Sequence, residues 1–382
     1  MSVKAFYFSE QFLEIIELSK QIAAEDNERR KKNQNVNHWK NFTGEDSLGR
    51  KYTETEKKMH DELSKLEKST IEDLLTIMYI GRGDDMGDDG TLVSENFADA
   101  REYYNRNVGP TKEVKVRQIF GKARVLHEYL TVGLEYVKNW QIGFGLQAID
   151  GLKPPNYLLE LAEKQVSGEM SYDEIEARLR LYYLKIAITD NMEADITSVR
   201  IAKILSSKKF KFSIEELKEC HRKIFSNIET FIYPAGEFRT EYITKDECIL
   251  NGNSVVYADP KKIYAELEHD FNQEASKSKS YCTKSREDVA HGIMSFVSDI
   301  WQIHPFREGN TRTSTVFAIK YLRSFGFALN NEPFKENSKY FRDSLALANA
   351  EWMNRTDKYL RMFTENTLLG GTHELVISKD ID

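Results

Sequence analysis

Nine consecutive residues, from His304 to Arg312, bring together side chains that can handle a phosphorylated substrate. The stretch holds an imidazole at its start, a carboxylate at Glu308, a side-chain amide at Asn310 and a guanidinium at its end. Gly309 lies among them, where it lets a ligand approach the backbone closely. Together these groups suit the gripping of a metal-bound polyphosphate beside a base that takes a proton from an incoming nucleophile.

The second half of the stretch has the composition of an anion site. Gly309 and Asn310 come just before a helix predicted to start near Thr311, so free backbone N–H groups and the positive helix end point at the loop. Asn310 can also donate a hydrogen bond to a phosphate oxygen. Arg312 can bind a second phosphate with its planar fork.

Glu308 and His304 could supply a metal ligand and a general base. Glu308 is a hard oxygen ligand of the kind that holds Mg²⁺ together with substrate phosphates. His304, with an ordinary pKa of about 6.5, is the natural general base for an attacking hydroxyl. The plainer alternative is a helix–turn–helix corner, in which His304 is a satisfied buried histidine and Arg312 pairs with Glu308. That alternative needs a separate explanation for each of the polar and glycine positions.

Local signals predict a helix on each side of this stretch. Apolar residues at helical spacing run through 289–300 directly into His304. A second helix is expected over about 311–325, ending at Gly326. Capping boxes predict further helix starts at three serines, Ser69, Ser171 and Ser213.

One segment departs from the helical pattern. Alternating residues between Phe238 and Tyr257 flank Asn251-Gly252, a dipeptide typical of a two-residue hairpin turn. The sequence therefore predicts an all-α fold with a single β-hairpin about fifty residues before His304, long enough to return and lie beside it.

Residues 304–312 resemble the signature of the Fic (filamentation induced by cAMP) family, His-Pro-Phe-x-(Asp/Glu)-Gly-Asn-(Gly/Lys)-Arg. Every fixed position agrees except Thr311, where glycine or lysine is usual. Supporting resemblance extends over about 187–368. The resemblance implies an all-α catalytic core with a β-hairpin flap, here at Asn251-Gly252.

The same resemblance implies transfer of AMP from ATP to a Ser, Thr or Tyr hydroxyl of a target protein, with Mg²⁺. His304 would then be the catalytic base and Glu308 the metal ligand. The nucleotide would be bound by four consecutive residues, Gly309, Asn310, Thr311 and Arg312. The flap near Asn251 and Gly252 would dock the target, and self-modification is a further expectation.

Residues 141–186 resemble the small helical antitoxin that restrains some Fic proteins, fused in front of the core. Its inhibitory helix carries (Ser/Thr)-x-x-x-Glu-(Gly/Asn), and the glutamate pairs with a second arginine of the catalytic motif. This chain has Leu146 and Asp150 at the first two of those positions and Thr315 at the second arginine. The three departures agree with one another and favour loss or alteration of the inhibition.

A competing candidate for the inhibitory pattern starts at Thr189. Thr189 and Glu193 have the required spacing, but Ala194 follows in place of Gly or Asn. A glutamate in so short a pattern is more often a plain helix-surface acid.

The predicted domains are a helical N-terminal domain of unknown function over 1–140, the antitoxin-like segment over 141–186, the Fic catalytic domain over 187–368 and a tail over 369–382. The acidic segment 84–90 lacks the ligand spacing of a calcium loop and is interpreted as an acidic turn.

The eight histidines offer no metal motif outside His304. His291 is expected to face the core side of its helix as a packing residue. The remaining six are scattered without metal spacing: His38, His60, His127, His221, His269 and His373.

Composition narrows the partners and the compartment. The 382 residues carry a formal net charge of −7, which argues against nucleic acid and membrane surfaces as partners. No apolar run reaches transmembrane length and no signal peptide is evident. The three cysteines, Cys220, Cys248 and Cys282, have no motif spacing and fit reduced thiols. A cytoplasmic protein is expected.

Two other functions remain open on the sequence alone. An enzyme of the same fold with other chemistry would transfer UMP, or would phosphorylate as the Doc relatives do. Gly309 argues against the Doc form, which has alanine there. A non-catalytic binding or regulatory module is the other alternative. Thr311 and Thr315 are compatible with it, whereas His304 and Glu308 argue against it.

Overall fold

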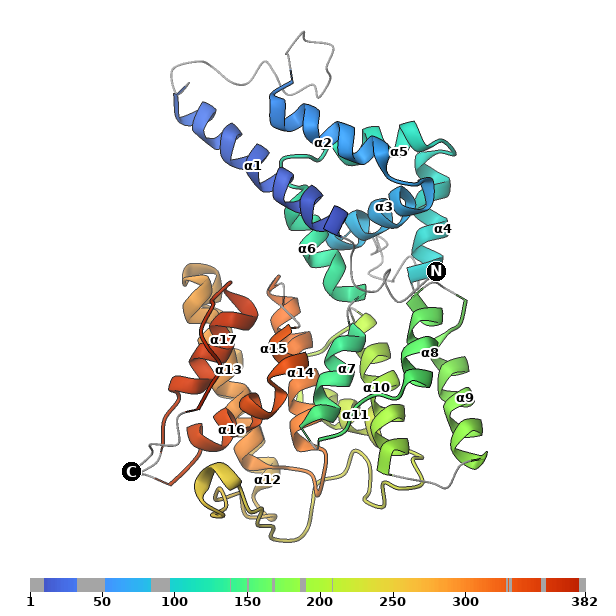
Figure 1. Ribbon diagram of the computed structural model, residues 1–382. Coiled ribbons are helices and arrows are strands. Elements are labelled where there is room, and N and C mark those ends of the chain that lie inside the picture. Colours follow the sequence, from blue (N-terminus) through green and yellow to red (C-terminus); the bar gives the residue numbers. More distant parts are fainter. Residues whose placement is uncertain are drawn as a thin grey trace. The chain divides into compact units, whose positions relative to one another are not determined.

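A computed structural model describes residues 10–32, 52–83, 97–137, 139–149, 151–166, 169–185, 190–207, 209–327, 329, 332–351 and 355–377. Within these ranges every regular element is a helix and no strand occurs, as Figure 1 shows. The chain divides into two compact units, Met1–Val137 with Glu163–Ser171 and Lys138–Ala162 with Tyr172–Asp382. No helix in the described ranges is long and apolar enough to cross a membrane.

The first unit is a small helical bundle. Its helices are α1 (Glu10–Lys32), α2 (Glu54–Lys65), α3 (Lys68–Arg82), α4 (Phe97–Val108), α5 (Lys112–Phe120) and α6 (Leu126–Val137). The apolar face of α3 is fully buried at Ile71 and Leu74. Helix α3 meets α6 at a glycine contact, because a Cβ at Gly133 would lie 2.1 Å from the carbonyl oxygen of Ile77. A larger residue at Gly133 would therefore push the two helices apart.

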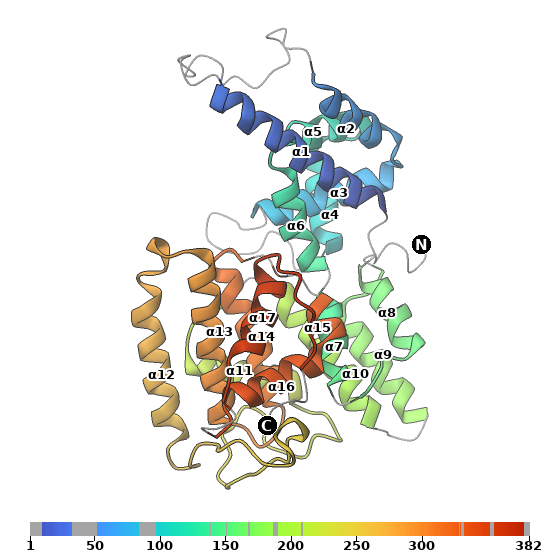
Figure 2. The same ribbon diagram turned by 60° about the vertical axis from the view of Figure 1, so that its left-hand side comes forward.

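The second unit holds the residues of interest. Its helices are α7 (Asn139–Ala148), α8 (Asn156–Val166, shared with the first unit), α9 (Tyr172–Lys185), α10 (Asp190–Ser206), α11 (Ile214–Phe225), α12 (Ile263–Ser278), α13 (Arg286–Ile303), α14 (Asn310–Ser324), α15 (Glu332–Glu336), α16 (Ser338–Ala348) and α17 (Lys358–Leu368). Helix α14 packs against α10, α11 and α13, and α13 in turn packs against α12 and α17 (Figure 2).

Two basic side chains of α14 fix the end of α10. The buried Lys320 Nζ donates to the carbonyl oxygens of Ile204 and Ser207, at 3.2 and 2.8 Å. Arg323 Nη1 donates to the carbonyl oxygen of Leu205 at 2.8 Å. These donors satisfy carbonyls that the end of an α-helix leaves unpaired. Because Glu193 near the start of α10 contacts Arg312 near the start of α14, the two helices run in the same direction.

The predicted helices on both sides of residues 304–312 are present. Helix α13 ends at Ile303 and α14 runs from Asn310 to Ser324. Ser213 is the N-cap of α11 as expected, since its side chain accepts a hydrogen bond from the N–H of Glu216 at 3.2 Å. The predicted start at Ser69 was wrong, because α3 begins at Lys68.

The predicted β-hairpin was also wrong in its strands. Asn251 and Gly252 do form a tight turn, with φ of 56° and 85°. However, a short 3₁₀ turn at Cys248–Leu250 precedes them, and the N–H groups of Leu250 and Gly252 bond back to the carbonyl of Glu247. These bonds fold the segment over itself, so no ladder extends along residues 238–257, all of which are described. We call residues 238–257 the flap loop.

Four predictions lie outside the described residues. They concern His38, the acidic segment 84–90, Asp150 of the antitoxin-like pattern, and Thr189 of the competing pattern.

Candidate active site

His304 is the C-cap of α13 and is almost fully buried, with 2% of its surface exposed. Its φ of 52° lies in the left-handed region, which turns the chain sharply out of the helix. Nδ1 lies 3.2 Å from the carbonyl oxygen of Trp301, and the ring centroid lies 4.1 Å from that of Tyr257, with the two rings tilted by 32°. Because a carbonyl only accepts, Nδ1 carries the hydrogen and the lone pair is on Nε2.

The Nε2 atom of His304 is buried and makes no hydrogen bond with the described residues. Burial lowers the pKa of His304 well below its usual 6.5, and the positive charge of Lys245 lowers it further. The ring is therefore neutral at pH 7, with a lone pair ready to accept a proton.

Arg239 holds the chain that follows His304. Its guanidinium donates to the carbonyl oxygens of His304 at 2.8 Å and of Ala258 at 2.6 Å. Its own N–H donates to the carbonyl oxygen of Pro305 at 2.9 Å. Arg239 thus ties the flap loop to the start of the motif through backbone carbonyls.

His221 holds the other side of the same loop. Its ring stacks on Phe306 at 3.9 Å, and Nε2 lies 3.0 Å from the carbonyl oxygen of Glu308. The N–H of Gly236 donates to Nδ1 at 2.8 Å, so Nε2 carries the hydrogen. Burial lowers the pKa of His221 to about 4, which keeps this tautomer neutral.

Gly309 is required for two independent reasons. It is the N-cap of α14 with φ of 79°, a conformation in which any L side chain is strained. In addition, a Cβ at this position would lie 2.4 Å from the ring of Phe225. Both features bring the backbone of the loop down onto Phe225 and leave the start of α14 open.

The side chain of Asn310 shapes the loop instead of pointing outward. Its Oδ1 accepts from the N–H of Phe306 at 2.9 Å, and its Nδ2 donates to the carbonyl oxygen of Phe306 at 2.7 Å. A hydrogen bond from this side chain to a phosphate would require breaking the second of these bonds. The contribution that remains at Asn310 is its backbone N–H in the first turn of α14.

Thr311 and Thr315, the two departures from the family pattern, bond to each other. Trp301 Nε1 donates to Thr311 Oγ1 at 3.0 Å, and Thr315 Oγ1 donates to the carbonyl oxygen of Thr311 at 2.7 Å. Thr315 is fully buried and borders a small apolar void with Met294 and Phe341. The position of the usual second arginine therefore faces the core.

Glu308 is paired with a lysine of the flap loop. Lys245 Nζ lies 3.0 Å from both carboxylate oxygens, and the N–H of Gly309 donates to Oε1 at 3.2 Å. Burial opposes the charged form, but the charge of Lys245 and these hydrogen bonds lower the pKa of Glu308 below its usual value. The carboxylate is therefore ionised at neutral pH.

Arg312 is paired with Glu193 of α10. Its Nη2 donates to Glu193 Oε1 at 2.8 Å, and Nη1 approaches Thr197 Oγ1 at 3.4 Å. The guanidinium also lies 4.6 Å from the ring centroid of Phe225. The alternative in which Arg312 pairs with Glu308 is thus not what the structure contains.

The structure brings five of the predicted site residues into one loop and helix start: His304, Glu308, Gly309, Asn310 and Arg312. Thr311 faces Trp301 instead of the open end of the loop. Four contacting residues were not predicted from the sequence as part of the site, namely His221, Phe225, Arg239 and Lys245. Their only local signal is polarity or aromaticity, because their contacts depend on the tertiary fold.

Part of the chain is similar to known proteins. Residues 211–322 match the model of the Fic/DOC family. A protein of Sinorhizobium fredii named "probable protein adenylyltransferase y4lH" is 36% identical over 125 residues, covering 33% of this chain. The match spans 59% of that relative's length. No solved structure matches the chain.

The family match begins at residue 211, after the segment 141–186. The antitoxin-like segment and the domain limits expected from the sequence therefore stay predictions.

Proposed function

We propose that this chain is a nucleotidyltransferase that moves AMP from ATP to a Ser, Thr or Tyr hydroxyl of a target protein, with residues 187–368 as its catalytic domain. The observation that carries the proposal is the state of His304. Its buried Nε2 makes no hydrogen bond with the described residues, and the ring is neutral. A base of this kind is positioned just before the open N-terminus of α14.

In the proposed step, a phosphoanhydride bond of ATP is exchanged for a phosphodiester bond to the target hydroxyl. The target hydroxyl oxygen bonds to the α-phosphorus as its proton passes to His304 Nε2. The bond between the α-phosphorus and the oxygen bridging to the β-phosphate breaks, and pyrophosphate leaves. The backbone N–H groups at the start of α14 stabilise the charge on the phosphate oxygens. Gly309 lets the α-phosphate approach them.

The carboxylate of Glu308 fits a divalent cation such as Mg²⁺. It is ionised, and its two oxygens are already positioned by a cation, Lys245. Mg²⁺ takes one or two protein carboxylates together with substrate phosphates, and when bound it would neutralise phosphate charge. Lys245 must move away from Glu308 to make room.

A restraint on the same site is part of the proposal. Arg312 is the residue expected to bind the distal phosphates, and Glu193 now holds it. Both side chains are mostly buried, with 13% and 22% exposed, so the pair is only weakly screened by solvent. We therefore assign the inhibitory role to Glu193. On the sequence pattern alone, Glu193 was the weaker candidate for the inhibitory acid, after Asp150.

Target docking is proposed at the flap loop around Asn251 and Gly252. Tyr242 and Val256 in this loop expose large apolar side chains, with 73% and 62% of their surfaces accessible. Exposed apolar side chains on a loop suit contact with a segment of another protein.

A labelling experiment tests the activity. The protein is incubated with a cell lysate, Mg²⁺ and either nucleoside triphosphates labelled on the α-phosphate or ATP labelled on the γ-phosphate, beside a His304→Ala control. We expect transfer of the α-label from ATP alone. Loss of the base should reduce the rate by about 10²–10⁴-fold.

The other outcomes separate the alternatives. Transfer of the γ-label would replace the proposal with phosphotransfer, and α-label from UTP would replace AMP with UMP. If neither the unaltered chain nor the Glu193→Gln variant transfers label from any nucleotide, the result would favour a non-catalytic binding module.

A further inference from the structure

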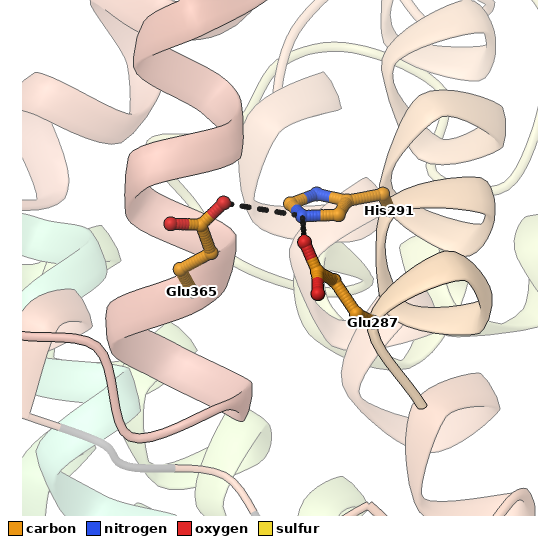
Figure 3. Close-up of side chains that lie close together, drawn as sticks. All are labelled: Glu287, His291 and Glu365. Carbon is orange, nitrogen blue, oxygen red and sulfur yellow. Dashed lines mark ion pairs between the residues drawn. The ribbon is translucent and has the colours of Figure 1, made fainter. Parts of the chain in front are cut away.

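A second cluster of ligand-type side chains lies in the same unit, at the beginning of α13. Glu287 and His291 are four residues apart on one face of α13, and Glu365 of α17 faces them (Figure 3). His291 Nε2 lies 3.3 Å from Glu365 Oε1 and 4.0 Å from Glu287 Oε1. One ligand atom from each residue lies within 4.8 Å of the other two.

The imidazole of His291 has the state expected of a ligand. Its side chain is nine-tenths buried, with 10% exposed, and its Nε2 makes no hydrogen bond of good geometry with the described residues. Figure 3 shows this nitrogen pointing between the two carboxylates.

A fourth donor is adjacent. His373 Nε2 contacts the other carboxylate oxygen of Glu365. The backbone of His373 is held in place by Asn366, which donates to its carbonyl oxygen at 2.7 Å and accepts from its N–H at 2.8 Å. The donors therefore come from α13, α17 and the segment after α17.

We propose that Glu287, His291 and Glu365 bind one divalent transition-metal ion, of which Zn²⁺ fits best, with His373 as a reachable fourth ligand. Imidazole nitrogen and carboxylate oxygen are common zinc donors, and sets of three to four ligands are usual. Ligand atoms around tetrahedral zinc are about 3.4 Å apart, close to the spacing from His291 to Glu365. The ion would clasp the start of α13 to α17.

The charges around the cluster permit a cation. Two carboxylates face one guanidinium, that of Arg361, so the surroundings stay net negative. Glu287 is exposed, which gives an ion a route in from solvent. The site is separate from Glu308, which lies beyond the opposite end of α13.

Zinc binding by the full chain tests this proposal. Protein without a polyhistidine tag is stripped of metal, and Zn²⁺ is titrated in competition with a chromophoric chelator at pH 7. The variants are His291→Gln and Glu287→Gln; the second alters only an exposed side chain and keeps the test valid if the first misfolds. Matched controls are His269→Gln, an exposed histidine on α12, and Glu308→Gln in the nucleotide site.

We expect one Zn²⁺ per chain, weakened at least tenfold by each of the two variants and unchanged in both controls. Zinc should also raise the melting temperature of the unaltered chain more than that of Glu287→Gln. Co²⁺ in place of Zn²⁺ should show absorption bands of a nitrogen and oxygen site without a thiolate band.

Three outcomes would overturn the proposal. They are no stoichiometric Zn²⁺ binding by the unaltered chain, binding that survives both His291→Gln and Glu287→Gln, and equal loss in His269→Gln. In each case the cluster is only a set of ion pairs.

Discussion

At the scale of single residues, His304 combines features that seldom occur together in a merely structural histidine. It is buried, its Nδ1 hydrogen is used by Trp301, and its Nε2 is without a hydrogen bond among the described residues. An unsatisfied buried polar atom costs free energy, on the order of 1–3 kcal/mol. Retaining one beside an open helix N-terminus is understandable if the atom meets a partner only when substrates bind.

The pKa of His304 leads to a pH prediction. Because burial and Lys245 hold this pKa below 6.5, the base loses its proton-accepting form only at lower pH. The acid limb of kcat/KM, which reports groups of the free enzyme, should therefore have its midpoint below pH 6.5. The measurement is transfer rate against pH, with circular dichroism at each pH to exclude unfolding.

An exposed histidine serves as the control for that profile. His269→Gln should leave the acid limb where it was. A midpoint at or above pH 6.5 would mean that His304 is not the titrating base or that its ring is more solvated than the structure indicates.

At the scale of elements, the site depends on how α10 and α14 are placed side by side. Lys320 and Arg323 fix the end of α10, and Glu193 near its start then reaches Arg312. The ion pair between Glu193 and Arg312 is thus part of the packing between two helices and is not formed by two mobile surface side chains. In the proposed mechanism, Arg312 binds phosphate after this contact opens.

Removing the charge of Glu193 should strengthen nucleotide binding. In a His304→Ala background, which prevents turnover, Glu193→Gln should bind ATP with Mg²⁺ about 5- to 30-fold more tightly. This corresponds to about 1–2 kcal/mol for one charge-assisted contact. Isothermal titration calorimetry measures the dissociation constant directly.

Glu215→Gln is the matched control, since it removes one negative charge from an exposed position on the neighbouring α11. It should leave ATP affinity unchanged. Equal affinity in the Glu193→Gln and unaltered backgrounds would show that the ion pair does not restrain the site.

Helix-level features were predicted from the sequence where the signals were local. The helices flanking residues 304–312 and the cap at Ser213 follow from periodicity and capping residues. The turn at Asn251-Gly252 was also predicted, but its strands were not formed. A strand requires a partner ladder, and here the chain bonds back to Glu247 instead.

The contacts that shape the site were beyond local prediction. Glu308 meets Lys245 across 63 residues of sequence, Arg312 meets Glu193 across 119, and His221 meets Glu308 across 87. Only the tertiary fold decides which of many charged residues become neighbours. The chemistry of the motif could be predicted from the sequence, but the residues that contact the motif could not.

At the scale of the whole molecule, buried neutral histidines make the chain sensitive to acid. His221, His291 and His304 all have lowered pKa values, with burial the first cause in each. As pH falls below about 6.5, these histidines become protonated in the unfolded chain before they do so in the folded chain. Stability is therefore full above that pH and is lost as pH falls towards the lower folded pKa values.

His221 should account for a measurable part of this loss. With its pKa lowered to about 4, its contribution between pH 6.5 and pH 4 is about 3 kcal/mol of unfolding free energy. Urea denaturation across this range should show a flatter pH dependence for His221→Gln than for the unaltered chain. An unchanged slope in the variant would place the acid sensitivity elsewhere.

The mass of the product tests most directly whether His304 acts as the base in AMP transfer to a hydroxyl. The Glu193→Gln variant is incubated with ATP and Mg²⁺, and modified Ser, Thr or Tyr residues on the chain itself and on lysate proteins are identified by mass spectrometry. We expect AMP adducts that disappear when His304→Ala is added. Phosphate adducts, or AMP adducts that persist without His304, would contradict it.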